Sequence, residues 1–79
     1  MANRVIKFGA TGNFEKFNNR DEIKAYVEGK GHKLMGKTID GADFLINNDL
    51  TSNSSKNKYA HDNNIPIITE NDLLHMLGE

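Results

Sequence analysis

Short apolar runs alternate with capped, helix-type segments along this chain, and this alternation restricts the possible folds more than any other feature. Residues 4–10, 32–35, 43–47 and 65–68 are predicted strands, and helices are expected between Asn19 and Gly29, between Ser54 or Ser55 and Asp62, and between Thr69 and Gly78. The order is therefore strand, helix, strand, strand, helix, strand, helix. Such an order is typical of an α/β domain whose parallel strands are joined by right-handed crossovers.

Capping residues support these helix positions. Asn19 stands where it can cap the first helix, with Glu22 placed to reach back to it, and Thr69 with Asp72 repeats this arrangement before the last helix. Asn63-Asn64 can supply a left-handed exit from the second helix.

The link between the second and third predicted strands leaves the sheet order open. Residues 36–41 form a short connection, and a short connection normally suggests an antiparallel hairpin. The alternation elsewhere favours parallel pairs, so pattern alone does not decide how these two strands are arranged.

The chain's length and composition exclude several classes of protein. Its 79 residues allow one domain, residues 1–79, and it contains no cysteine, which excludes thiol catalysis and fits a reducing compartment. No apolar stretch approaches the ~18 residues of a membrane helix, and no signal peptide is recognisable. We therefore expect no membrane contact and an intracellular location, namely the cytoplasm if the source is a bacterium or a phage.

Charge is unevenly distributed along the chain. The net charge of −1 argues against a protein that coats nucleic acid by bulk electrostatics. Residues 1–37 nevertheless hold eight Lys and Arg against four Asp and Glu, whereas residues 38–79 hold two against seven. One interpretation is solvated helix faces; the other is that one end of the domain faces a phosphate.

Three short motifs carry groups that bind phosphate. Thr11-Gly12 closes the first strand with a hydroxyl and an unobstructed amide, Arg20 begins the first helix, and Ser55-Lys56 begins the second. Amides at a helix N-terminus favour an anion, lysine supplies a point charge, and arginine binds bidentately. Brought together, these groups predict a pocket for one phosphate. The competing interpretations are an ordinary turn at Thr11-Gly12 and a helix-capping role for Ser55.

Other chemistry has little support in the sequence. Gly9 to Gly12 resembles the start of a dinucleotide-binding turn, but Glu15 occupies the place of the third glycine and the chain is too short for paired crossovers. The three histidines are scattered without ligand spacing, and His61-Asp62 has no nucleophile partner. We therefore expect no metal, no cofactor and no catalysis by this domain alone.

The runs FGATG, NRDEIKAYVEGKGHKLMG, ADFLIN, SSKNKYA and IPIITENDLLHML together resemble a BRCT domain. The likeness is greatest to the single BRCT modules of bacterial NAD-dependent DNA ligases and of the replication factor C large subunit, and it spans residues 5–77. Two positions depart from the family pattern. Leu73 stands where the last helix usually carries an aromatic residue, and Gly31-His32 replaces a Gly-Gly pair.

The resemblance implies a four-stranded parallel sheet in the order 2-1-3-4, with helices one and three on one face and helix two on the other. Ligands of such sheets lie beyond the carboxyl ends of the strands, where the crossovers diverge. In phosphate-binding members a Ser or Thr, the following Gly and a Lys bind the phosphate, and these positions match Thr11, Gly12 and Lys56. The replication factor C type adds an arginine, which Arg20 matches.

The resemblance therefore implies a non-catalytic BRCT module of a DNA replication or repair protein, most simply a DNA ligase. Its expected ligand is DNA, bound through a 5′-phosphate at an end or nick by Thr11, Gly12, Arg20, Ser55 and Lys56. Any ligase activity would belong to a parent chain. The alternative is a protein-interaction or self-association module with a vestigial pocket, which would dock a protein partner through Phe14 and Phe17 or through the last helix.

Overall fold

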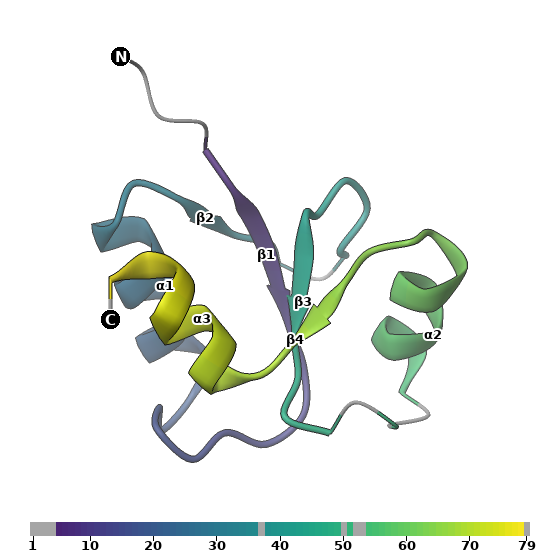
Figure 1. Cartoon of the computed structure of the whole chain (residues 1–79), viewed down its shortest axis with the longest axis horizontal. Helices are drawn as coiled ribbons and strands as arrows, with labels where there is room; N and C mark the ends of the chain where they lie inside the picture. Colours follow the sequence, from purple (N-terminus) through teal and green to yellow (C-terminus); the bar gives the residue numbers. More distant parts are fainter. Residues whose placement is uncertain (1–4, 37, 50, 52–53, 79) are drawn as a thin grey trace.

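The computed structural model describes residues 5–36, 38–49, 51 and 54–78 (Figure 1). Its elements are, in chain order, β1 (Lys7–Ala10), α1 (Arg20–Gly29), β2 (Lys33–Leu34), β3 (Phe44–Ile46), α2 (Ser55–Asp62), β4 (Ile67–Ile68) and α3 (Glu70–Leu77). This order of strands and helices confirms the sequence prediction. The start of the first predicted strand, residue 4, lies outside the described residues.

The strands are shorter than predicted, and at the starts of β2 and β4 the reason is that backbone amides bond outside the sheet. The amide of Ile65 donates to Ala60 O at the exit of α2, and Pro66 has no N–H, so β4 begins only at Ile67. The amide of His32 donates to Val27 O at the exit of α1, so it cannot bond within the sheet, and β2 begins only at Lys33.

All four strands are parallel and lie in the order β2-β1-β3-β4, as the resemblance implied. The short connection after β2 does not form a hairpin. It crosses to the far side of β1, where the amide of Asp43 donates to Lys7 O at 2.7 Å and the Asp43 carboxylate accepts from the Lys7 amide at 3.0 Å. These two bonds align β3 with β1.

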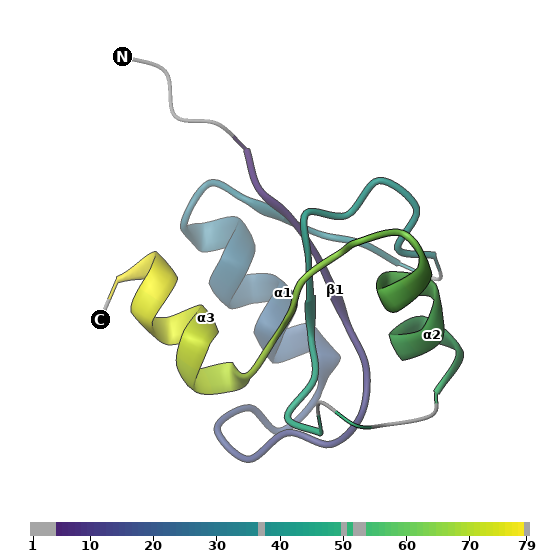
Figure 2. The same cartoon turned by 45° about the vertical axis from the view of Figure 1, so that its right-hand side comes forward.

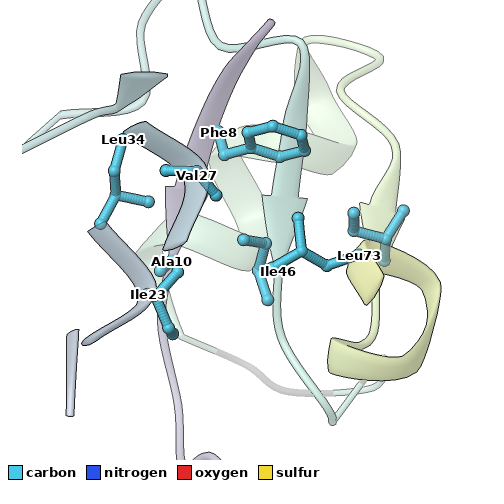
Figure 3. Close-up of a cluster of buried hydrophobic side chains, with 8 residues drawn as sticks. Phe8, Ala10, Ile23, Val27, Leu34, Ile46 and Leu73 are labelled. Atoms are coloured by element: carbon cyan, nitrogen blue, oxygen red, sulfur yellow. The ribbon is translucent and has the colours of Figure 1, made fainter. Parts of the chain in front are cut away.

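The helices lie on both faces of the sheet. Figures 1 and 2 show α1 and α3 side by side on one face and α2 alone on the other. The larger hydrophobic cluster lies under α1 and α3 (Figure 3) and comprises Phe8, Ala10, Ile23, Val27, Leu34, Ile46, Ile68 and Leu73. A smaller cluster on the α2 side comprises Ile39, Ala42, Leu45 and Ala60. Both faces of the sheet are therefore buried, as expected for a parallel sheet.

The predicted caps are present, and the structure decides between the two candidate serines. The side chain of Ser54, and not Ser55, accepts the Asn57 amide and caps α2. Asn19 caps α1, and Thr69 with Asp72 forms a complete capping box on α3. These short-range bonds set where each helix starts.

Candidate functional site

The candidate site lies at the carboxyl ends of β1 and β3. Ala10 pairs with Ile46, and the next residue, Thr11, donates its backbone N–H to Ile46 O at 3.0 Å. From here the chain after β1 runs to α1 on one face, while the chain after β3 runs to α2 on the other (Figure 1). This divergence is the switch point at which open α/β sheets bind ligands.

Gly12 occupies a position that requires glycine on two counts. Its φ of +86° lies in the left-handed region, and a Cβ atom there would lie 2.6 Å from Asn47 Oδ1. Gly12 is exposed, so its backbone is open to an approaching ligand.

Lys56 reaches from the first turn of α2 to the end of β1. Its Nζ donates to Ala10 O at 3.4 Å. Partial burial and, to a smaller extent, the positive charge of Arg20 lower the pKa of Lys56 below its ordinary value of 10.5. The ammonium is thus held at the residue that precedes Thr11.

Arg20 is held by the connection that follows β2. Its Nη2 donates to Met35 O at 2.6 Å and to Gly36 O at 3.2 Å. Its Nε is buried and makes no hydrogen bond to any described residue. Within the described part of the chain, neither Arg20 nor Lys56 has a carboxylate at ion-pair distance. Because the charge of Arg20 lowers the pKa of Lys56, these two cations, which come from helices on opposite faces of the sheet, repel each other.

Ser55 lies on α2 beside Lys56. It is exposed, and with Lys56 it borders a hollow of about 180 Å³ that is also lined by Thr38, Ile39 and Tyr59. No hydrogen bond that involves described residues joins Ser55 to Thr11 or Gly12. The predicted residues thus follow different strands: Thr11 and Gly12 follow β1, Lys56 reaches Ala10 at the end of β1, and Arg20 binds the connection after β2. Gly12, Arg20 and Lys56 border three different hollows, and Ser55 shares that of Lys56.

Gly12 borders a different hollow, whose lining differs in charge from that beside Lys56. It has a volume of about 400 Å³ and is lined by Gly12, Asn13, Glu15, Asn47, Asn48 and Asp49. Its two carboxylates disfavour an anion.

Sequence reasoning missed Glu70, which organises the loop between β1 and α1. Glu70 is only 2% exposed. Its carboxylate accepts the backbone amides of Glu15 at 2.8 Å, Lys16 at 2.9 Å and Phe17 at 3.2 Å, and the Asn48 side-chain amide at 2.6 Å. One signal was present, a carboxylate directly after the cap Thr69, but a helix start explains that residue equally well.

A buried amide pair lies beneath Gly12. Asn47 and Asn57 are 1% and 4% exposed, and Asn47 Nδ2 donates to Asn57 Oδ1 at 2.7 Å. Asn47 Oδ1 accepts the Asp49 amide at 2.9 Å, and Asn57 Nδ2 donates to Asp49 O at 3.4 Å. This network joins the end of β3 to the first turn of α2, the turn that carries Lys56, and so helps to position Lys56 relative to Gly12.

Two other kinds of site find no support in the part of the chain that the structure describes. No three His, Asp or Glu side chains there are grouped to hold a metal ion. No helix among those residues has the length and apolar character needed to cross a bilayer.

Comparison with known proteins relates nearly the whole chain to DNA ligases. It is 50% identical over 73 residues to a DNA ligase of Ruminiclostridium cellulolyticum and 45% identical over 74 residues to one of Lachnoclostridium phytofermentans. A DNA ligase of Treponema denticola is 32% identical over 74 residues. These alignments cover 92%, 94% and 94% of this chain but only 11% of each ligase.

No family model matches the chain. No solved structure matches it either. The chain is thus similar, over almost its full length, to one small segment of proteins named DNA ligase.

Proposed function

We propose that this chain is a BRCT-type, non-catalytic module of a DNA ligase that binds DNA through a 5′-phosphate at an end or a nick. The observation that carries the proposal is that Lys56 donates to Ala10 O at the end of β1, while Arg20 lies near enough to lower the pKa of Lys56. Neither cation has a carboxylate at ion-pair distance among the described residues. The similarity to DNA ligases and the parallel sheet in the order β2-β1-β3-β4 support it.

Each residue contributes a different interaction. The amide of Gly12 and the hydroxyl of Thr11 are suited to donate to phosphate oxygens, and the ammonium of Lys56 adds a point charge. Arg20 brings a guanidinium that is already oriented by Met35 O and Gly36 O, so little entropy is lost on binding. A bound phosphate would also relieve the repulsion between the two cations.

Ligation chemistry is assigned to the remainder of a parent chain. The matched segment is 11% of the length of each ligase. Thr11, Gly12, Arg20 and Lys56 are suited to binding an anion, and they do not form a catalytic nucleophile with an adjacent general base. The module would therefore contribute affinity for the DNA end, while the reacting groups lie elsewhere.

The test is a fluorescence-anisotropy titration of this chain against one duplex, with a 5′-phosphate and with a 5′-hydroxyl, at about 50 and 200 mM salt. We expect tighter binding to the phosphorylated duplex. Replacing Lys56 or Arg20 by alanine should weaken that binding by ~1.5–3 kcal/mol, the contribution of a charge-assisted hydrogen bond. Lys58→Ala removes the same charge from an exposed position of α2 and is the matched control.

Equal affinity for the two duplexes in the wild type would reject the proposal. A phosphate preference that Lys58→Ala removes as effectively as Lys56→Ala would also reject it, since diffuse charge would then explain the binding.

A protein-interaction or self-association module is the second candidate. Phe14 and Phe17 pack against the larger cluster but stay partly exposed, and Met76 on α3 is 41% exposed. Sedimentation equilibrium of the chain across a concentration series tests self-association. A monomer at all concentrations, with binding that follows the 5′-phosphate, would favour DNA as the ligand.

A further inference from the structure

We propose that Glu70 is a positioning residue for the phosphate site: it holds the loop 11–19 in the shape that brings Thr11-Gly12 and Arg20 to the same phosphate. This inference rests on the proposed function and adds to it a residue that contacts no DNA. It is carried by the hydrogen bonds around Glu70, by its burial and by the place of the loop in the chain.

The loop links the two halves of the proposed site. Thr11 and Gly12 stand at its start, and Asn19 at its end caps the helix that begins with Arg20. The loop contains no helix or strand. Its path therefore has to be set by contacts with other parts of the molecule, and that path determines how far Gly12 lies from Arg20.

Glu70 contacts the middle of this loop. Three successive amides, those of Glu15, Lys16 and Phe17, converge on its two carboxylate oxygens. Successive amides that point at one anion form a concave anion-binding arrangement. Here the anion belongs to the protein, so the loop closes around Glu70, and the exposed backbone of Gly12 is left to face an external phosphate.

Glu70 is itself rigidly placed. It is the first residue of α3, directly after the cap Thr69, where the helix dipole favours a negative charge. Asn48 binds it twice, through Nδ2 to Oε1 at 2.6 Å and through Oδ1 from the Glu70 amide at 3.0 Å. Asn48 Nδ2 also reaches Asn13 O at 3.4 Å, next to Gly12. The loop is thus tied to the ends of both β3 and β4.

The test compares Glu70→Gln with Asp72→Asn in the chain as it stands. Glu70→Gln keeps the shape of the side chain but replaces one acceptor oxygen by an amide group that faces N–H donors. Asp72→Asn removes a carboxylate from the same first turn of α3 and weakens its capping box, but Asp72 makes no bond to the loop among the described residues. Both variants remove one negative charge from the first turn of α3.

Two quantities are measured for each variant: the ratio of Kd values for the 5′-hydroxyl and 5′-phosphate duplexes, and the hydrogen exchange of the amides of residues 15–17 by NMR. We expect Glu70→Gln to reduce the ratio roughly tenfold, as expected for loss of charged hydrogen bonds, and to speed exchange at those amides. Asp72→Asn should leave both at wild-type values.

A wild-type ratio in Glu70→Gln, with exchange at residues 15–17 accelerated, would overturn the inference and leave the proposed function intact. A wild-type protein without any phosphate preference would remove the proposed function and this inference with it. If Glu70→Gln does not fold, as judged by circular dichroism, Asn48→Ala decides. It keeps the carboxylate and removes one tie to it, and an unchanged ratio in that variant overturns the inference.

Discussion

Asn48 and Glu70 exchange two hydrogen bonds: Asn48 Nδ2 donates to Glu70 Oε1 at 2.6 Å, and the Glu70 amide donates to Asn48 Oδ1 at 3.0 Å. Asn48 follows β3 by two residues and Glu70 follows β4 by two residues. The pair therefore joins the carboxyl ends of two neighbouring strands. Because the same carboxylate binds the loop after β1, one side chain connects the ends of three strands around the candidate site.

The carboxylate of Glu70 should make the free energy of unfolding depend on pH in the acidic range. Burial alone would raise the pKa of Glu70, but the bonds from Asn48 and from the amides of residues 15–17 outweigh burial and lower that pKa below its ordinary value of 4.5. A lowered folded-state pKa gives stability that is present above pH 4.5 and lost as the pH falls through the folded-state value. The measurement is urea unfolding between pH 7 and pH 2. Glu70→Gln should be less stable than the wild type at pH 7, and the difference should shrink in acid; a difference independent of pH would contradict this assignment.

The repulsion between Arg20 and Lys56 should be visible in the titration of Lys56. We expect the NMR titration midpoint of the Lys56 side chain to lie below 10.5 in the free protein, because partial burial and Arg20 disfavour the charged form. Arg20→Ala should raise the midpoint, whereas Lys24→Ala on the same helix should not change it. Bound 5′-phosphorylated duplex should raise it as well. A midpoint that Arg20→Ala leaves unchanged would show that the two charges do not interact.

Gly12→Ala should destabilise the protein more than Gly31→Ala does. Both glycines have left-handed φ values, +86° and +87°, so each alanine incurs about 1–2 kcal/mol of backbone strain. A Cβ at Gly31 has open space, whereas a Cβ at Gly12 would lie 2.6 Å from the buried Asn47 side chain. Thermal or urea unfolding of the two variants measures the difference. Equal losses would mean that Asn47 moves aside without cost.

Leu73→Ala should cost about 2–5 kcal/mol of the free energy of unfolding, the usual result of truncating a buried leucine. Leu73 is fully buried in the larger cluster, at the position where the resemblance implied an aromatic residue. Met76 on the same helix is 41% exposed, so Met76→Ala is the control and should change stability by less than about 0.5 kcal/mol. Urea unfolding compares them. Similar small losses in both variants would show that α3 packs loosely against the sheet.

Local patterns in the sequence predict the order of the elements and the starts of the helices. Thr69 and Asp72 cap α3 across three residues, and Asn19 caps α1 across the same separation. Interactions of this range depend on neighbours along the chain, so capping residues and apolar periodicity predict them directly. The residues of the proposed phosphate set were found in the same way, as short motifs at the ends of predicted elements.

The way in which those elements pack together depends on contacts between residues far apart in the chain. Pattern left the step from β2 to β3 open, because a short connection permits either a hairpin or a crossing, and the crossing depends on the pairing of Asp43 with Lys7. Glu70 binds amides 53 to 55 residues away. No local pattern contains such a bond, because it exists only when the carboxyl ends of β1, β3 and β4 are side by side. For the same reason the proximity of Arg20 to Lys56, which carries the proposed function, is a property of the fold.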